Sequence, residues 1–461
     1  MSLLTRPYAP RATLCCVTVN SADSERALIG QLLRRTGFGA SGAEIDAALA
    51  NGYEATVDGL FAPVTDPGAL ATPAPTGLVD VRAGQTTPAQ QQAANKDRSA
   101  QQYDLLAWWL RRMTGVQRPW VEKRTFFWHG HYATSISKVR SAPMMLAQNQ
   151  TQRQLGGGDF KTLMRTMFTD PAMMVWLDAE GNTAKSPNEN LARESMELFS
   201  LGVGNYTEDD VRAAAQALTG WRLNRTNDVA VFEPKAHTAG PETIFGTTAD
   251  FDVDSFTDLL LAQPANAKFL ATRMWFRFGS SAAVPADTLG RLVTAYGPSW
   301  DLTALARAVF TDPRFVSGST SDTQYALVKQ PTEYVVGVLR ALKIMPPASG
   351  SDKASGVLRN VLNGLGQVPF DPPNVGGWPS GLLWLTTAAG QARITFADWA
   401  VKTGDISAVA DAAASSRIDA AANLLGVDGF SDRTRGALSD AVADPAVLVG
   451  LALMSPEYLV N

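Results

Sequence analysis

Apolar residues repeat at helical spacing along most of the chain. Between Ser24 and Arg35 they fall on one stripe of a helix, and the pattern returns after Ser41, a favourable N-cap. Residues 62–88 are rich in Pro, Gly, Thr and Ala, which predicts a linker or a long surface loop. A long helix over 88–114 is predicted to follow, with its apolar positions in the C-terminal half.

Several helix boundaries carry a signal of their own. A helix is predicted from Pro119 to Gly130, because proline is favoured in a first turn and glycine at a helix end. Residues 163–171 and 305–313 share the pattern Leu-x-Arg-x-x-Phe-Thr-Asp-Pro. In each copy Asp can cap the helix that Pro begins, so we expect two tight helix corners and a weaker third at 454–458.

Strand patterns are few. Residues 229–232 and 243–245 can form a small hairpin or an irregular excursion, and helices return from about residue 324 with a break at 369–379, where Pro and Gly gather. The predicted fold class is therefore mainly α, multi-helical, in two closely packed lobes. The expected division is a disordered leader 1–22, an N-terminal lobe 23–225, a loop or hairpin excursion 226–250 and a C-terminal lobe 251–461.

Charge and hydropathy narrow the classes of partner. The chain has 461 residues and a formal net charge of -4, which gives no reason to expect a nucleic acid. Its best basic run, from Arg111 to Arg124, is interleaved with tryptophans and is assigned to the solvated face of a helix. No stretch approaches the roughly 20 apolar residues that span a bilayer, so no transmembrane segment is expected.

The first residues leave the cellular location open. Basic residues precede a short, partly apolar run that ends near Val19 without a clear cleavage site. The two cysteines, Cys15 and Cys16, are neighbours and cannot join distant segments or form a cysteine zinc site. This usage suits a reducing compartment such as the cytoplasm and does not exclude export.

Histidine is scarce, and two of the three histidines stand close together in His129-Gly130-His131. On a continuous helix residues i and i+2 point roughly 200° apart, but a helix that ends at Gly130 lets both rings turn to one side. They can then be metal ligands, or they can decorate a helix C-terminus, where the helix dipole favours a cation. Both alternatives stay open.

The most polar predicted helix spans 186–202. Ser186, Pro187 and Glu189 form a capping-box pattern at its start. Arg193 and Glu197 can form an ordinary i,i+4 ion pair; alternatively Glu194 or Glu197 meets the two histidines across a cleft and completes a metal site.

The third histidine, His237, stands in a loop, where functional side chains are common. Several segments together now resemble the bacterial family of unknown function DUF 1800. The motifs that carry the resemblance are Leu32-Leu-Arg-Arg-Thr-Gly-Phe-Gly39, Phe127-Trp-His-Gly-His-Tyr132, Asn188-Glu-Asn-Leu-Ala-Arg-Glu-Ser-Met-Glu-Leu-Phe-Ser-Leu-Gly202, Ala217-Leu-Thr-Gly-Trp221, His237 and Pro373-Asn-Val-Gly-Gly-Trp378.

The resemblance implies a motif set and a setting, but no reaction. Many members of the family look exported, and they are often encoded beside proteins similar to alkaline phosphatases and sulfatases. The positions that coincide with family motifs are His129, His131, Asn190, Arg193, Glu194 and His237. Family members commonly have Asp after the third histidine and Lys shortly beyond, where this chain has Thr238 and Glu242, so a different ligand is expected here if those positions bind one.

Two functions of different classes follow. The first is a metal-dependent enzyme, a hydrolase by preference, with a divalent ion held by His129, His131 and Glu194 or Glu197. Arg193 would clamp an anionic group of an unknown substrate, and His237 would act as acid or base. The second is a non-catalytic scaffold or partner of an envelope-associated phosphatase- or sulfatase-like protein, in which the same polar side chains join helices.

Overall fold

In the computed structural model, which describes residues 22–81, 87–317 and 326–461, most helices begin at caps that the sequence supplies. The Ser41 side chain accepts a hydrogen bond from Glu44 N, and the Glu44 carboxylate accepts one from Ser41 N, which starts α2 (Gly42–Leu49). Thr87 and Gln90 form the same box at the start of α5 (Pro88–Gly115). The predicted long helix is therefore confirmed. Cys15, Cys16 and all but the last residue of the predicted leader 1–22 lie outside the described residues.

The three predicted helix corners are also confirmed. Asp170 Oδ1 accepts a hydrogen bond of 2.9 Å from Met173 N, and Asp312 Oδ1 accepts one of 2.9 Å from Arg314 N. Ser455 Oγ accepts from Tyr458 N at 3.2 Å. In each corner a proline begins the short helix that follows, where its missing N–H costs no hydrogen bond.

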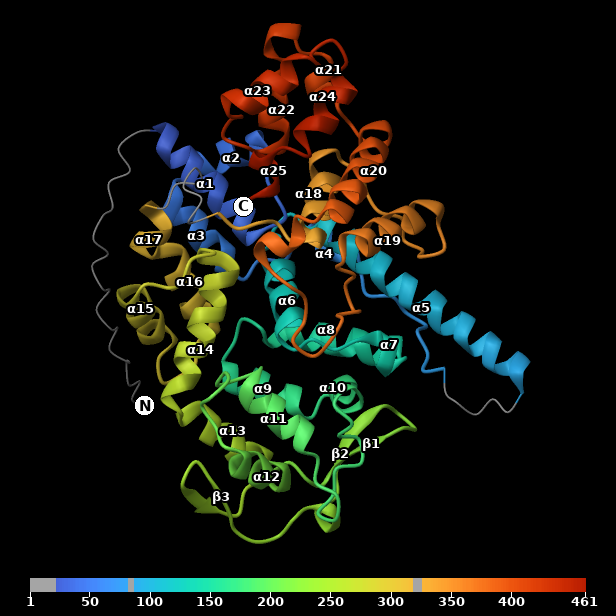
Figure 1. The fold of residues 1–461 in the computed structure, drawn as a ribbon, viewed down its shortest axis with the longest axis vertical. Helices are drawn as coiled ribbons and strands as arrows, with labels where there is room; N and C mark the ends of the chain where they lie inside the picture. The colour runs from blue at the N-terminus through green and yellow to red at the C-terminus, as the bar shows by residue number, and fades with distance from the viewer. Residues whose placement is uncertain (1–21, 82–86, 318–325) are drawn as a thin grey trace, which may run out of the picture.

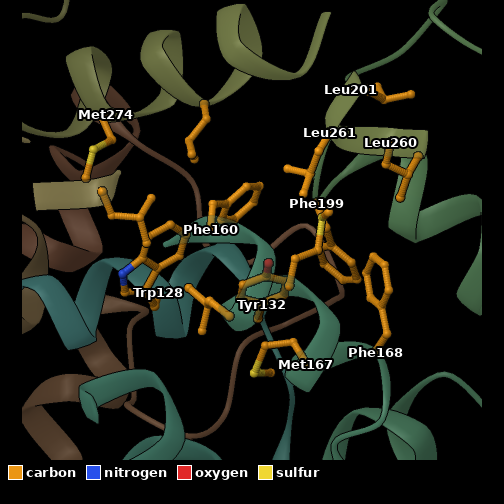
Figure 2. Close-up of a cluster of buried hydrophobic side chains, with 14 of the residues drawn as sticks. Trp128, Tyr132, Phe160, Met167, Phe168, Phe199, Leu201, Leu260, Leu261 and Met274 are labelled. Carbon is orange, nitrogen blue, oxygen red and sulfur yellow. The ribbon is translucent and has the colours of Figure 1, made fainter. Parts of the chain in front are cut away.

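Buried apolar side chains of the described residues form two cores, and helices from both halves of the chain contribute to each. The first core is built mainly by α1 (Ala22–Thr36), α3 (Tyr53–Phe61), α6 (Trp120–His131), α9 (Phe160–Phe168), α10 (Pro171–Trp176), α11 (Glu189–Glu197), α12 (Glu208–Ala217), α13 (Val253–Ala262), α14 (Pro264–Met274), α15 (Ala286–Tyr296), α16 (Leu302–Thr311) and α17 (Pro313–Ser317). Figure 2 shows Tyr132 within this core, between Trp128 and Phe199.

The second core lies on the other side of α6 and in Figure 1 extends from the top of the molecule down to the right-hand side, where α5 and α7 lie. It is built by α5, α7 (Ile136–Val139), α8 (Ala142–Leu155), α18 (Pro331–Ala341), α19 (Lys353–Leu365), α20 (Thr387–Thr403), α21 (Ser407–Ala410), α22 (Arg417–Leu425), α23 (Asp432–Ser439), α24 (Pro445–Ala452) and α25 (Pro456–Leu459). The remaining short helices are α4 (Pro67–Leu70), η1 (Pro234–Ala236), η2 (Trp275–Gly279), η3 (Gly381–Trp384) and η4 (Ala414–Ser416).

The grouping of helices in the two cores differs from the predicted lobes. Helices α13 to α17, which follow the excursion, pack in the first core with the N-terminal motifs, whereas α5 and α8 pack in the second core with the C-terminal helices. The lobes 23–225 and 251–461 stay a prediction about domain boundaries. Along the sequence, helices of the first core alternate with helices of the second, so the chain passes from one core to the other more than once.

The strands form two antiparallel hairpins at the lower end of the molecule (Figure 1), which confirms the predicted small excursion in a mainly α fold. Strand β1 (Trp221–Asn224) pairs with β2 (Val229–Phe232), and β3 (Glu242–Ile244) pairs with β4 (Thr247–Ala249). The two predicted segments thus pair with near neighbours and not with each other. At the second turn Phe245 and Gly246 both have positive φ (48° and 73°), as a two-residue turn of type I′ requires.

The predicted end of helix α6 at Gly130 is wrong, because the helix continues through His131 and the N–H of Tyr132 still bonds to Trp128 O at 2.8 Å. Packing of the following Tyr132 ring between Trp128 and Phe199 outweighs the local preference of glycine for a helix end. No helix in the described ranges is long and apolar enough to cross a bilayer.

Candidate functional site

His129 lies on the side of α6 that faces the second core. Its Nε2 accepts a hydrogen bond of 2.8 Å from Phe370 N, in the Pro- and Gly-rich segment 369–379. The imidazole is 1% exposed and lies among the rings of Trp109, Phe370 and Trp378, with centroids 5.2, 5.3 and 5.4 Å away. Burial lowers its pKa to about 3, so the ring is neutral at physiological pH.

His131 lies on the opposite side of the same helix, in the first core. Its Nε2 is 3.1 Å from Phe199 O, and since a carbonyl only accepts, Nε2 carries the proton. Its Nδ1 has no hydrogen-bond partner among the described residues. Burial, followed by the charge of Arg273, holds its pKa well below the ordinary value. The two histidines therefore serve different cores, as i and i+2 on a continuous helix must.

The polar side chains of α11 have hydrogen-bond partners other than the predicted ones. Arg193 forms a two-pronged ion pair with Glu208 of α12, with Nη1–Oε1 and Nη2–Oε2 distances of 2.6 and 2.7 Å, and not the i,i+4 pair with Glu197. Glu197 instead accepts a hydrogen bond from the Tyr206 hydroxyl. Partial burial and then the charge of Glu197 raise the pKa of the Glu194 carboxyl, which makes no hydrogen bond to a described residue.

The start of α11 also differs from the predicted capping box. Asn188 is the N-cap: its Oδ1 accepts a hydrogen bond of 2.7 Å from Leu191 N, while its Nδ2 donates to Leu177 O and Asp178 O. Asn188 and not Ser186 is the cap, because its side chain bonds both the first turn of α11 and backbone carbonyls that follow α10. The exposed Asn190 donates to the same Leu177 oxygen at 3.3 Å.

His237 follows the short helix η1 and packs on the motif 217–221. Its Nδ1 is 3.0 Å from Thr219 O and 3.2 Å from Thr219 Oγ1. Thr238, at the position where family members commonly have Asp, donates from N to Thr219 Oγ1 at 2.8 Å and from Oγ1 to Gln216 Oε1 at 2.6 Å. Gly220 has φ +88°, and a Cβ there would lie 2.9 Å from His237 Cβ, so this position requires glycine.

The structure does not bring the predicted metal ligands together. Among residues 22–81, 87–317 and 326–461 no group of three His, Cys, Asp or Glu side chains could hold a metal ion. His129 Nε2 and His131 Nε2 are occupied by separate backbone groups. This arrangement does not fit the predicted ligand set of His129, His131, Glu194 and Glu197, and the divalent ion stays a prediction.

Sequence reasoning missed two buried carboxylates, Glu122 on α6 and Glu333 on α18. Both Glu122 oxygens accept from arginines, at 2.6 Å from Arg112 Nε and 2.8 Å from Arg153 Nε and Nη2, and Trp109 Nε1 donates at 2.9 Å. Facing charges lower the pKa of Glu122 to about 2 despite burial.

Glu333 forms ion pairs with Lys123 and Arg277. Burial alone would raise the pKa of Glu333, but the charges of Arg277 and then Lys123 outweigh it and lower the pKa to about 2. Lys123 is fully buried and Arg112 is largely buried, so their assignment to a solvated helix face was wrong. The available signal was a Glu-Lys-Arg run inside an otherwise aromatic helix, which no solvated stripe can accommodate.

Neither the comparison with curated proteins nor the comparison with solved structures found a match. The model of one family, described as protein of unknown function DUF1800, matches residues 31–460. That span holds every motif that carried the resemblance and covers nearly the whole chain, so the predicted family is confirmed. The chain belongs to the DUF1800 family.

Proposed function

We propose that the protein is a non-catalytic scaffold whose polar motif residues join its helices into a rigid body for a partner protein. The observation that carries the proposal is the 2.8 Å hydrogen bond from Phe370 N to His129 Nε2. It joins the histidine motif of α6 to the Pro- and Gly-rich segment, two motifs far apart in the chain. A buried, neutral histidine that accepts a backbone N–H is a structural contact.

The other motifs support the same role. Arg193 joins α11 to α12, and Asn188 joins α11 to the end of α10. His237 and Thr238 fasten their loop to the 217–221 motif. The resemblance supplies the class of partner, an alkaline-phosphatase- or sulfatase-like protein of the envelope, which is tested by size-exclusion chromatography of the two purified proteins mixed together.

The metal-dependent hydrolase remains the competing prediction, and one set of variants separates the two. Under the scaffold proposal His129→Ala removes the acceptor of a buried N–H and opens a cavity among aromatic rings, so we expect a loss of about 3 kcal/mol in the free energy of unfolding. Glu194→Gln should not lower stability, because this carboxyl makes no hydrogen bond to a described residue and its raised pKa shows that the fold does not stabilise its charge.

Metal content is measured on the same proteins by plasma mass spectrometry after dialysis. The scaffold proposal expects no retained divalent metal in the wild type and a lower urea midpoint for His129→Ala only. It is overturned if the wild type holds about one equivalent of metal that both His129→Ala and Glu194→Gln lose while their urea midpoints stay unchanged.

A further inference from the structure

A cavity of about 420 Å³, open to solvent, lies between the end of α3, the segment that follows it, α6 and α16. None of the predicted site residues lines it. Its size is within the range of about 300–1,000 Å³ typical of small-molecule sites. The described residues that line it are Leu60, Phe61, Ala62, Pro63, Val64, Thr65, Val121, Arg124 and Thr303.

Arg124 is the one charged residue among these nine. Its guanidinium is largely buried, and its Nε, which is shielded from solvent, has no hydrogen-bond partner among the described residues. The hydrogen bond that it makes within the described ranges runs from Nη2 to Arg153 O, at 3.1 Å. Burial lowers its pKa to about 10, so it keeps its charge at neutral pH. A guanidinium has five N–H donors in a rigid fork, and most of this fork remains unused.

Among the described residues no carboxylate forms an ion pair with this guanidinium, and only the more distant charge of Glu122 raises its pKa. The nearest carboxylate in sequence, Glu122, is already saturated by Arg112, Arg153 and Trp109. Three arginines thus share one carboxylate around this part of α6. A buried cation without an ion-pair partner is costly, and an oxyanion that accepts from Nη1, the guanidinium nitrogen that neither donates to Arg153 O nor is shielded from solvent, would recover part of that cost.

The walls of the cavity suit an apolar body. The Phe61 ring is backed by Trp120 and Phe310 of the first core, with centroid distances of 5.9 and 6.4 Å. Val64 is 62% exposed and Val121 is 38% exposed, so both present apolar surface to solvent. Arg124 is the single charged group among the described lining residues, and Arg307, which lies over the Phe61 ring, is already paired with Asp58. The cavity therefore matches a singly charged anion better than a phosphate dianion.

We propose that this cavity binds a small organic carboxylate, with the carboxylate group on Nη1 of Arg124 and its apolar part between Phe61 and Val64. The guanidinium packs against the backbone of Gly157, because a Cβ at that position would clash with Nη1 of Arg124. The site is independent of the scaffold role of the motif residues.

Titration calorimetry of the full chain with phenylacetate tests the proposal, with the neutral phenylacetamide as the matched ligand. We expect phenylacetate to bind and phenylacetamide to bind at least about tenfold more weakly, since charge-assisted hydrogen bonds supply the difference. Arg124→Met should weaken phenylacetate binding by a similar factor, whereas Arg165→Met, which changes a partly exposed arginine paired with Asp254, should not.

A second variant, Val64→Asp, is needed because Arg124→Met could lose phenylacetate binding only through disturbed packing around residue 124. The Val64 side chain is exposed, so the variant should fold as the wild type does, yet its carboxylate would repel the ligand and weaken binding by about tenfold or more. The proposal is overturned if phenylacetate gives no binding heat at millimolar concentration, if the amide binds equally well, or if Val64→Asp leaves the affinity unchanged.

Discussion

Substitution of Glu122 by Gln keeps the shape of the side chain but removes the negative charge that pairs with Arg112 and Arg153. Glu122 is 1% exposed, and its two oxygens accept four hydrogen bonds, three of them from the arginines. After the change two largely buried guanidinium groups face a neutral amide. Breaking a buried ion pair by removal of one partner costs about 3–5 kcal/mol, because the remaining charge is left uncompensated.

The pKa of Glu122 supplies an independent magnitude. A carboxyl whose pKa falls from 4.5 to about 2 on folding stabilises the folded state by roughly 3 kcal/mol when ionised. The two routes agree, so we expect Glu122→Gln to lower the free energy of unfolding by about 3 kcal/mol at neutral pH. This is a large part of the 5–15 kcal/mol that is typical of a folded domain.

The assay is urea unfolding followed by tryptophan fluorescence, in which Trp109 is itself a partner of Glu122. A shift of the midpoint at constant slope reports stability. The matched control is Glu208→Gln, which makes the same chemical change in a two-pronged pair with Arg193 whose carboxylate is 62% exposed. An exposed pair is screened by water, so the control should lose much less.

The second part of the experiment compares the stability of the wild type and Glu122→Gln at acidic pH. The folded-state pKa of Glu122 lies below the unfolded value, so its stabilisation is present above pH 4.5 and is lost as the pH falls toward about 2. The gap between wild type and Glu122→Gln should therefore narrow over that interval. A loss for Glu122→Gln no larger than that for Glu208→Gln, or a gap that stays constant down to pH 2, would refute the argument from burial.

Three further outcomes are expected. Burial raises the pKa of Asp170 from 3.8 to about 6, so the ionised carboxylate destabilises the folded state above pH 6. Asp170→Asn keeps the oxygen that caps the helix but has no charge, so it should raise the urea midpoint at neutral pH. This gain should vanish below about pH 4, where the wild-type carboxyl is protonated in both states. Gly220→Ala meets Phe232 Cε2 at 2.7 Å and should lower thermal stability more than Gly204→Ala, which has a similar positive φ in open space. His129 stays neutral when folded, so its contribution is present above pH 6.5 and is lost as the pH falls toward 3, where the wild-type midpoint should drop more than that of His129→Gln.

Features that depend on neighbours in sequence were predictable. Ser41 caps α2 because its hydroxyl needs only the N–H of Glu44, three residues away. The Asp-Pro corners at 170 and 312 depend on the fixed φ of proline and a short side chain beside it. The mainly α fold follows from the same local periodicity, and the motifs that identify the family need no three-dimensional information.

Partners that come from distant parts of the chain were not predictable by the same means. Arg193 has Glu197 one turn away but binds Glu208, because α12 brings both oxygens of that carboxylate within hydrogen-bond distance of the guanidinium. Glu122 contacts Arg153 only because α6 and α8 pack together, and His129 contacts Phe370, which is 241 positions away in the sequence. Such choices are made by tertiary packing, which leaves no periodic signal in the sequence.

Helix α6 explains why the histidine motif suggested a metal site and why the structure separates its rings. A helix that is apolar on one stripe must turn its polar residues to water, but α6 carries aromatic rings around its circumference and is buried on both sides. Phe126 and His129 face the second core, whereas Trp128 and His131 face the first. On a helix with two buried sides, a spacing of i and i+2 assigns one imidazole to each core. The same spacing would bring both rings to one ion only if the helix ended between them, and the hydrogen bond from Tyr132 N to Trp128 O keeps it continuous.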